Sequence, residues 1–321
     1  MLTPKGRGSL SDIVFESMRE PSTGWDLALS TIPDDDDDLQ ITLWALYELH
    51  YRGFDDVDDS LEWQPELIEV RRSLEAVFEN TLRDRFSSAG PAGDDSVPDG
   101  DLAQDLFAYV EQHDGPSLAR HVQREADHEQ MLELLRMRSI YHLKESDPTA
   151  WVVPRLPTST KAALVELQFD EYGCGDPNRL HAELFARGLN ACGLSPEYGA
   201  YIDDVPIEVL EQNNAMSLFG LHRRLRGAAL GHLAAFEMTS SVPSRQIAQG
   251  LDRVGLPATM TGYYLEHVEA DAVHEQLAAR TICGSLVRDE PALRGDIFLG
   301  AFTCLDLESR FAHRMLREWA A

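Results

Sequence analysis

Apolar residues recur every three or four positions along most of this sequence. That spacing places them on one face of an α-helix, whereas a half-buried β-strand needs strict alternation of apolar and polar residues, and such runs are scarce here. The sequence therefore predicts an all-α protein. We expect helices over residues 42–54, 102–145 with a break at 114–116, 159–172, 180–192, 206–213, 217–240, 244–254, 258–285 and 297–318.

One segment interrupts this periodicity. Residues 87–100 (SSAGPAGDDSVPDG) combine Ser, Gly, Pro and Asp over a length that no periodic element uses. They predict a loop or linker with a domain boundary close to it. Another local signal lies before the first predicted helix, where Pro33 and the acidic run 34–38 are typical of a helix N-terminus, because acidic side chains stabilise that end of the helix dipole.

The composition narrows the range of partners. With 55 acidic against 28 basic residues, the chain has a formal net charge of -27 at pH 7, and its field would repel nucleic acid and anionic membranes. No apolar run approaches the roughly 20 residues that span a bilayer, and the first residues lack the apolar stretch of a secretory signal. We therefore expect a cytoplasmic protein that binds neither nucleic acid nor a membrane. The cysteines form no CxxC pair and are expected to be reduced thiols.

The segment 264–275 (YLEHVEADAVHE) carries three possible metal ligands at helical spacing. At about 100° per residue, positions four and seven apart fall within about 40° and 20° of the first, so His267, Asp271 and His274 share one helix face. Two imidazoles and a carboxylate suit iron, manganese or zinc. A single helix cannot close around a metal ion, so further ligands must come from other helices.

Acidic and His residues on otherwise apolar helices are the candidates for those further ligands. Glu237 follows the apolar run 233–236 (LAAF), where an unpaired carboxylate would be costly, and it is a candidate bridge between two ions. Glu171 and His181 flank the segment 172–180 (YGCGDPNRL), whose glycines and proline could bend the backbone. On an unbroken helix these two residues would lie about 15 Å apart, too far for one ion. They could instead serve the two ends of a dinuclear site.

A second stretch repeats the same spacing and competes with the first. His121, Glu125 and His128 also stand four and seven positions apart, but their neighbours are mostly charged, which is typical of an exposed helix with local ion pairs. The helix around 267–274 has an apolar flank, and this burial pattern favours it as the metal-binding stretch.

Five stretches together carry a resemblance to a known family: LKESDPTAWVVPRL, ALVELQFDEYGCG, LHAELFARGL, GHLAAFEMTSSVP and EHVEADAVHE, in order between Gln130 and Arg310. In these residues the chain resembles the iron-containing redox enzyme family, the haem-oxygenase-like dimetal oxidases. The resemblance implies a haem-oxygenase-like helical bundle of seven helices over 126–321, which binds two iron ions and no haem. It also implies an N-terminal helical extension over 1–125, which in similar proteins helps to form a homodimer.

The resemblance also implies the ligands. All six matching positions hold a ligand-type residue: Glu171, His181, Glu237, His267, Asp271 and His274. Some members that oxygenate nitrogen atoms add a carboxylate from a preceding auxiliary helix, and Glu145 stands where that ligand would be, although it could equally be an acid that ends a helix. Tyr172 is a candidate hydrogen-bond partner of a ligand, because it is next to Glu171. The competing stretch at 121–128 lies outside the matched core.

The function implied is that of a non-haem diiron oxygenase or oxidase, which activates dioxygen as co-substrate with electrons from an external donor. Reactions in the family include N-oxygenation of amines, desaturation or C–C cleavage of amino acids, and oxidative decarboxylation of fatty acids, and the sequence does not choose among these small-molecule substrates. Candidates for pairing with a substrate carboxylate are Arg179, Arg223, Arg224 and Arg226. Two alternatives stay open: a metal-free haem-oxygenase-like enzyme of cofactor metabolism, and a non-catalytic metal-binding helical scaffold.

Overall fold

The structure is a computed structural model that describes residues 1–21, 24–90 and 101–320, and for residues 269–273 it describes the backbone alone. Every regular element within these ranges is helical, which confirms the predicted all-α class. The first part of the chain forms α1 (Ser9–Arg19), α2 (Trp25–Ser30), α3 (Asp36–Glu48) and α4 (Pro65–Ser88). The rest forms α5 (Leu102–Glu111), α6 (Leu118–Arg124), α7 (His128–His142), α8 (Asp147–Ala150), α9 (Thr158–Glu171), α10 (His181–Ala191), α11 (Ile207–Leu221), α12 (Arg226–Arg253), α13 (Ala258–Gln276), α14 (Gly284–Asp289) and α15 (Arg294–Trp319).

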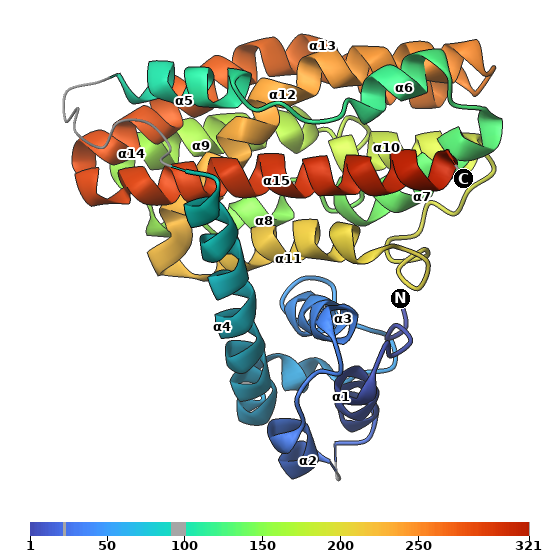
Figure 1. Cartoon of the computed structure of the whole chain (residues 1–321), viewed down its shortest axis with the longest axis vertical. Coiled ribbons are helices and arrows are strands. Elements are labelled where there is room, and N and C mark those ends of the chain that lie inside the picture. Colours follow the sequence, from blue (N-terminus) through green and yellow to red (C-terminus); the bar gives the residue numbers. More distant parts are fainter. Residues whose placement is uncertain (22–23, 91–100, 321) are drawn as a thin grey trace.

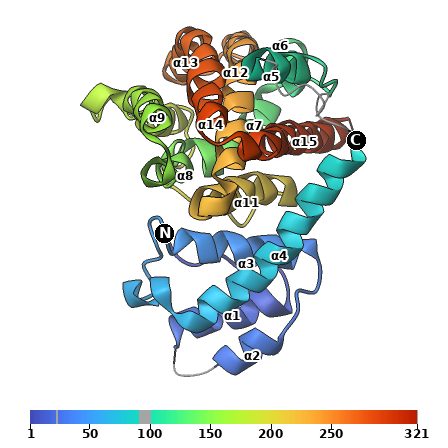
Figure 2. The ribbon, with the colours of Figure 1, turned by 90° about the vertical axis from the view of Figure 1, so that its left-hand side faces the viewer.

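The helices are arranged as a large body and a smaller layer beneath it (Figure 1). Helices α1 to α3 form the small layer, and α4 leads from it to the body, where it contacts α15 (Figure 2). Helix α11 is the element of the body that packs against α3. Helices α5 and α6 belong to the predicted extension over 1–125, but they lie along α12 on the body. The part of that extension that lies outside the body is therefore α1 to α4, of which α3 and α4 contact the body.

Helix α12 is the centre of the body, because it packs along both α13 and α15. Its contact with α15 is made nearly backbone to backbone. A Cβ atom added at Gly300 of α15 would come within 1.9 Å of the carbonyl oxygen of Ala228, and one added at Gly231 of α12 would come equally close to the carbonyl oxygen of Ile297. Only glycine fits at these two crossings, and the crossings fix the height and rotation of α12 in the bundle.

This close approach predicts a difference between two glycine-to-alanine substitutions. Gly300→Ala should lower the free energy of unfolding by about 1–3 kcal/mol, since the added methyl group meets backbone that cannot move aside. Gly262→Ala in α13 is the matched control, because a Cβ atom there meets nothing within 4 Å, and it should be neutral or stabilising by up to about 1 kcal/mol through helix propensity. Denaturant unfolding of both variants measures this, and equal effects would contradict the packing described.

The helix boundaries expected between residues 206 and 254 differ in the structure. Residues 217–240 were expected to form one helix, but 217–221 belong to α11, which ends at Leu221. Residues 226–240 join the helix expected over 244–254, because α12 runs unbroken through Pro243. A proline inside a helix costs about 3 kcal/mol, because it removes one backbone hydrogen bond, and packing along both α13 and α15 outweighs that cost.

Even α12, with 28 residues, is not apolar enough to cross a membrane, and the same holds for every other helix in the described ranges.

The predicted helix over 102–145 has a second break, at 125–127, beyond the expected one. The Asp127 side chain accepts a hydrogen bond from the Gln130 N–H at 2.9 Å, and the Gln130 side chain accepts one from the Asp127 N–H at 3.0 Å. This reciprocal capping starts α7 as a new helix. His121 and His128 therefore belong to different helices, and the shared-face argument does not apply to them.

The predicted helix over 258–285 is also divided. Helix α13 ends at Gln276 and continues as a π-helix (Leu277–Cys283), which leads into α14. The wider turns of a π-helix shift the direction of the side chains that follow, and such turns occur often beside functional sites. Here the π-helix packs against α9 and α12.

Candidate metal centre

Six of the seven predicted ligands gather in the interior of the body in two groups. Within each group, one ligand-type atom from each side chain lies within 4.8 Å of the others, and each of the six residues is at most 7% exposed. The first group is Glu145, His181 and His267, and the second is Glu171, Glu237 and His274. The seventh predicted ligand, Asp271, has a side chain that lies outside the described residues.

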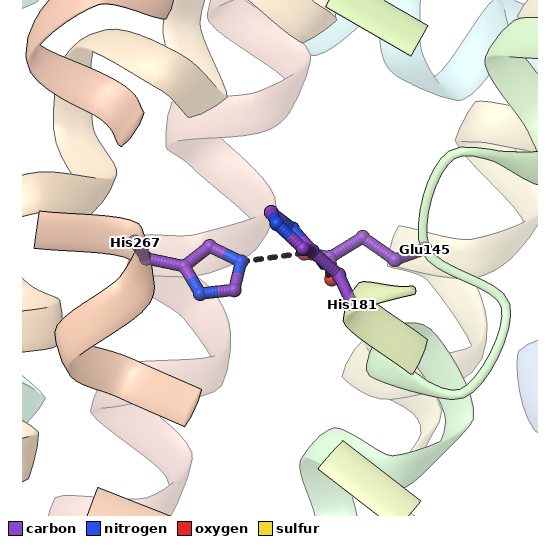
Figure 3. Close-up of side chains that lie close together, drawn as sticks. All are labelled: Glu145, His181 and His267. Carbon is purple, nitrogen blue, oxygen red and sulfur yellow. Dashed lines mark ion pairs between the residues drawn. The ribbon is translucent and has the colours of Figure 1, made fainter. Parts of the chain in front are cut away.

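The first group joins three separate parts of the chain (Figure 3). His267 projects from α13, His181 is the first residue of α10, and Glu145 lies in the turn between α7 and α8. The Glu145 carboxylate lies 3.5 Å from Nε2 of His267 and 4.0 Å from Nδ1 of His181. The sequence left open whether Glu145 was a ligand or a helix-ending acid, and the structure places its carboxylate among the imidazoles.

A tight turn brings the first group next to the second. After α9 the backbone takes left-handed conformations at Gly173, Cys174 and Gly175, with φ of 70°, 56° and 84°. A Cβ atom at Gly173 would lie 2.5 Å from the backbone of the returning chain, so the turn requires glycine there. The reversal places His181 Nδ1 only 3.0 Å from the carboxylate of Glu171, although the two residues stand ten positions apart.

Glu171 is the carboxylate that touches both groups. One of its oxygens lies 3.0 Å from Nδ1 of His181 and the other lies 3.4 Å from Nδ1 of His274. The Glu237 carboxylate, which the sequence suggested as a bridge, lies 3.5 Å from the same nitrogen of His274. A side chain that offers one oxygen to each group has the geometry of a bridging ligand, and the described contacts therefore favour Glu171 for that role.

The electrostatics of the second group are those of a cation site. Burial alone would raise the pKa of Glu171, but the neighbouring His181 and His274 outweigh it and bring the pKa to about 2. Burial opposes a charge on His274, yet the carboxylates of Glu171 and Glu237 raise its pKa to about 11. These residues thus concentrate negative charge around one buried position, where the imidazole carries a proton that a divalent cation can replace.

The inner nitrogens of two histidines fit a metal better than they fit a hydrogen bond. Nδ1 of His181 and Nδ1 of His274 are buried and make no hydrogen bond of good geometry. Both face carboxylate oxygens within 4.0 Å. Imidazole nitrogens and carboxylate oxygens that converge in this way are the donor set that suits iron or manganese.

The outer nitrogens of the α13 histidines have their own partners. Nδ1 of His267 donates to the backbone carbonyl of Tyr263 at 2.9 Å, which leaves Nε2 turned towards Glu145. Nε2 of His274 lies 3.3 Å from a carboxylate oxygen of Asp170, which leaves Nδ1 turned towards Glu171. Such contacts fix the tautomer and orientation of a metal-binding imidazole. Sequence reasoning missed Asp170, and its position beside Glu171 was the one available signal.

Two tyrosines extend the hydrogen-bond network around Glu145. The Tyr263 hydroxyl donates to the Glu145 carboxylate at 3.1 Å and also contacts Nδ1 of His142 at 2.7 Å. The hydroxyl of Tyr172, which the sequence suggested as a partner of a ligand, donates instead to Asp147 at 3.0 Å. The Tyr172 hydroxyl is therefore bound by Asp147, the first residue of α8, and not by one of the six gathered ligands.

A small cavity lies beside the ligands. Four of the gathered ligands contribute to its lining: Glu145, Glu171, Glu237 and His267. The rest of its lining is apolar apart from three hydroxyl groups: Tyr141, Ser146, Pro148, Thr149, Met216, Leu233 and Phe236. None of the four arginines considered for a substrate carboxylate lines this cavity; Arg224 and Arg226, for example, pair with Glu79 and Glu290.

The competing stretch does not form a site. His121 lies 3.6 Å from Glu125, and His128 lies 3.5 Å from its neighbour Glu129. The His128 side chain is 52% exposed. The residues form local surface pairs rather than a buried group, in agreement with their charged neighbours in the sequence.

Comparison with known proteins identifies the family of this chain. Residues 132–309, more than half of the chain, match the sequence profile of the iron-containing redox enzymes. The chain belongs to the iron-containing redox enzyme family, which confirms the resemblance seen in its sequence.

Solved structures agree on the fold. A crystal structure of a CADD-like protein of unknown function from Nostoc punctiforme PCC 73102 has a TM-score of 0.55 and 15% sequence identity, over 68% of this chain and 96% of that chain. A second crystal structure of the same protein has a TM-score of 0.51 and 15% identity, over 68% and 94%. A search of curated proteins finds no match. The haem-oxygenase-like helical fold expected from the sequence is thereby confirmed.

The two histidine stretches give a direct test of the ligand assignment. After anaerobic loading with Fe²⁺, His274→Ala should bind about one iron ion fewer per chain than the unsubstituted protein, because it loses a ligand that no other described imidazole replaces. His128→Ala is the matched control and should bind as much iron as the unsubstituted protein. Iron content after desalting measures both, and an equal loss in the two variants would contradict the assignment.

Proposed function

We propose that this chain holds two iron ions between α9, α10, α12 and α13 and uses them to activate dioxygen for the oxidation of a small metabolite. The strongest support is the position of the Glu171 carboxylate, whose two oxygens face the imidazoles of two adjacent buried groups. Membership of a family of iron-containing redox enzymes supports iron as the metal. Asp271 stays the seventh expected ligand within this proposal.

The charges of the described ligands suit two divalent ions. Three carboxylates, from Glu145, Glu171 and Glu237, offset most of the charge of two Fe²⁺ ions, and three neutral imidazoles add donors without adding charge. Two Fe²⁺ ions at this centre would supply electrons that reduce dioxygen beside a bound substrate, with an external donor to restore them. The protein's own part is to hold the donor atoms in place through Asp170 and the Tyr263 carbonyl.

The cavity determines what can approach the ligands. Met216, Leu233 and Phe236 offer an apolar wall, which favours binding of an apolar part of a substrate and excludes bulk water from the ligands. Ser146 and Thr149 offer hydroxyl groups that can orient a polar group of the substrate. Amines, amino acids and fatty acids are the substrate classes we propose, with N-oxygenation, desaturation or C–C cleavage, or oxidative decarboxylation as the outcome.

We also propose that two copies of the chain associate through the layer formed by α1 to α3. Three large apolar residues of this layer within six positions, Leu27, Leu29 and Ile32, are 55%, 39% and 81% exposed, and clusters of exposed apolar side chains are common at interfaces between subunits. Sedimentation equilibrium measures the mass of the protein in solution and therefore the number of chains that associate. A homodimer is expected, and a monomer at all concentrations tested would contradict the proposal.

Dioxygen consumption tests the proposed activity. The protein should bind two Fe²⁺ ions per chain without air and should consume dioxygen when air is admitted. Glu237→Gln keeps the shape of the side chain but removes its charge, and it should lower the rate of consumption by at least about tenfold, since even indirect partners of a metal ligand cost that much.

His128→Ala serves as the control and should consume dioxygen at the unsubstituted rate. If the unsubstituted protein bound no iron, a metal-free enzyme of the same fold would be the better account. If it bound two ions but consumed no dioxygen with any amine, amino acid or fatty acid supplied, it would be a metal-binding scaffold.

A further inference from the structure

Glu145 differs from the other described ligands in how the chain carries it. The other five stand on helices α9, α10, α12 and α13, whereas Glu145 lies in the four-residue turn 143–146 between α7 and α8. A side chain on a helix is positioned by the helix, but one on a turn depends on what holds the turn. The contacts of residues 143–147 therefore decide where the Glu145 carboxylate lies.

A buried ion pair holds the residue immediately before Glu145. The ammonium group of Lys144 contacts the carboxylate of Glu48, the last residue of α3, and the two residues are 2% and 0% exposed. The Tyr198 hydroxyl donates to the same carboxylate at 2.7 Å. The ring of Tyr51 lies under the Lys144 ammonium, with its centroid 4.3 Å away. Lysine and glutamate are almost never buried so completely unless they are paired.

Two further contacts fix the turn on either side of this pair. Arg52, which follows α3, donates to the carbonyl oxygen of Leu143 at 2.7 Å. On the other side, Ser146 has φ of 35°, a conformation that is strained for any residue except glycine. Its hydroxyl donates to Glu171 at 3.4 Å. The turn is therefore held at one end by Glu48 and Arg52, which lie at the end of α3 and just after it, and at the other end by Glu171 of the second group.

The buried pair of Glu48 and Lys144 is better explained by its effect on the position of Glu145 than by its effect on the free energy of folding. When two opposite charges are buried together, the loss of their hydration cancels most or all of their attraction, so a buried ion pair adds little to the free energy of folding. Its directional contacts nevertheless hold the paired groups in one arrangement. Here that arrangement fixes the backbone that carries Glu145 against His181 and His267.

We propose that the N-terminal layer, formed by α1 to α3, helps to hold the metal centre in place. Glu48 and Lys144 are then positioning residues for the Glu145 carboxylate. This inference rests on the proposed function, because it assigns Glu145 to a metal ion. The inference adds that the layer formed by α1 to α3 is required to bind the ion beside Glu145, His181 and His267, and is not required to bind the ion beside Glu237 and His274.

Titration with Co²⁺ alone tests the proposal. The double variant Glu48→Gln/Lys144→Met replaces both charges by neutral side chains of similar size, so no lone charge is left buried. It should bind one of two Co²⁺ ions at least about tenfold more weakly, as is usual when the support of a metal ligand is lost, and bind the other with unchanged affinity. The absorption spectrum of the ion that stays bound should match that of His181→Ala and not that of His274→Ala.

The matched control breaks another ion pair that docks the N-terminal part of the chain on the body, in which Glu211 is buried and the Arg85 side chain is 22% exposed. Arg85 of α4 donates to Glu211 of α11 at 2.9 Å, and neither residue contacts the turn 143–146. The double variant Arg85→Met/Glu211→Gln should bind both Co²⁺ ions with unchanged affinity. Equal weakening in the two double variants would overturn the proposal, because it would show a general effect of loosened docking.

Other outcomes separate this inference from the proposed function. If the unsubstituted protein bound two ions and Glu48→Gln/Lys144→Met bound both unchanged, the positioning role would be wrong while the dinuclear site stood. If the unsubstituted protein bound no Co²⁺ ion, both the positioning role and the dinuclear site would be wrong. Should the double variant not fold, Arg52→Met and Tyr198→Phe take its place, since each removes one hydrogen bond to the same scaffold. They should weaken the same ion to a smaller extent, and unchanged affinity in both would overturn the proposal.

Discussion

The structure depends on the mutual neutralisation of carboxylates and imidazoles inside a helical bundle. An isolated ionised carboxylate in a protein interior is strongly unfavourable, yet Glu145, Glu171 and Glu237 are all buried beside histidines. The charges of the six side chains offset one another only if four helices and one turn bring them together at one place in the bundle. The glycine crossings of α12 and α15, the left-handed turn after α9 and the buried pair at Lys144 each fix one part of that meeting.

The arrangement also separates two tasks. Helices α9, α10, α12 and α13 carry donor atoms on rigid backbones, with Asp170 and the Tyr263 carbonyl orienting the imidazoles. The turn between α7 and α8 carries Glu145 and also contributes Ser146 to the cavity that lies beside the ligands. Its contacts with the N-terminal layer connect residues that are about 96 positions apart in the chain. The layer of α1 to α3 is therefore linked to the centre through one short segment.

Much of the fold follows from the sequence, and the limits have physical causes. Helical periodicity predicts the class, and the spacing of His267 and His274 predicts that both face one way. Periodicity could not show that α12 continues through Pro243, because packing on both flanks decides that. It could not show that Asp127 caps a new helix between His121 and His128, which depends on two local hydrogen bonds. The buried pair of Glu48 with Lys144 left no pattern in the sequence, because it joins distant segments.

The central claim is that each of the two groups connected by Glu171 holds one metal ion, and anomalous diffraction tests this claim most directly. Crystals grown without air in the presence of Fe²⁺ should show two peaks at the iron absorption edge, one beside Glu145, His181 and His267 and the other beside Glu237 and His274, with Glu171 between them. A single peak, or iron only on the protein surface while these six side chains kept the same positions, would contradict the account.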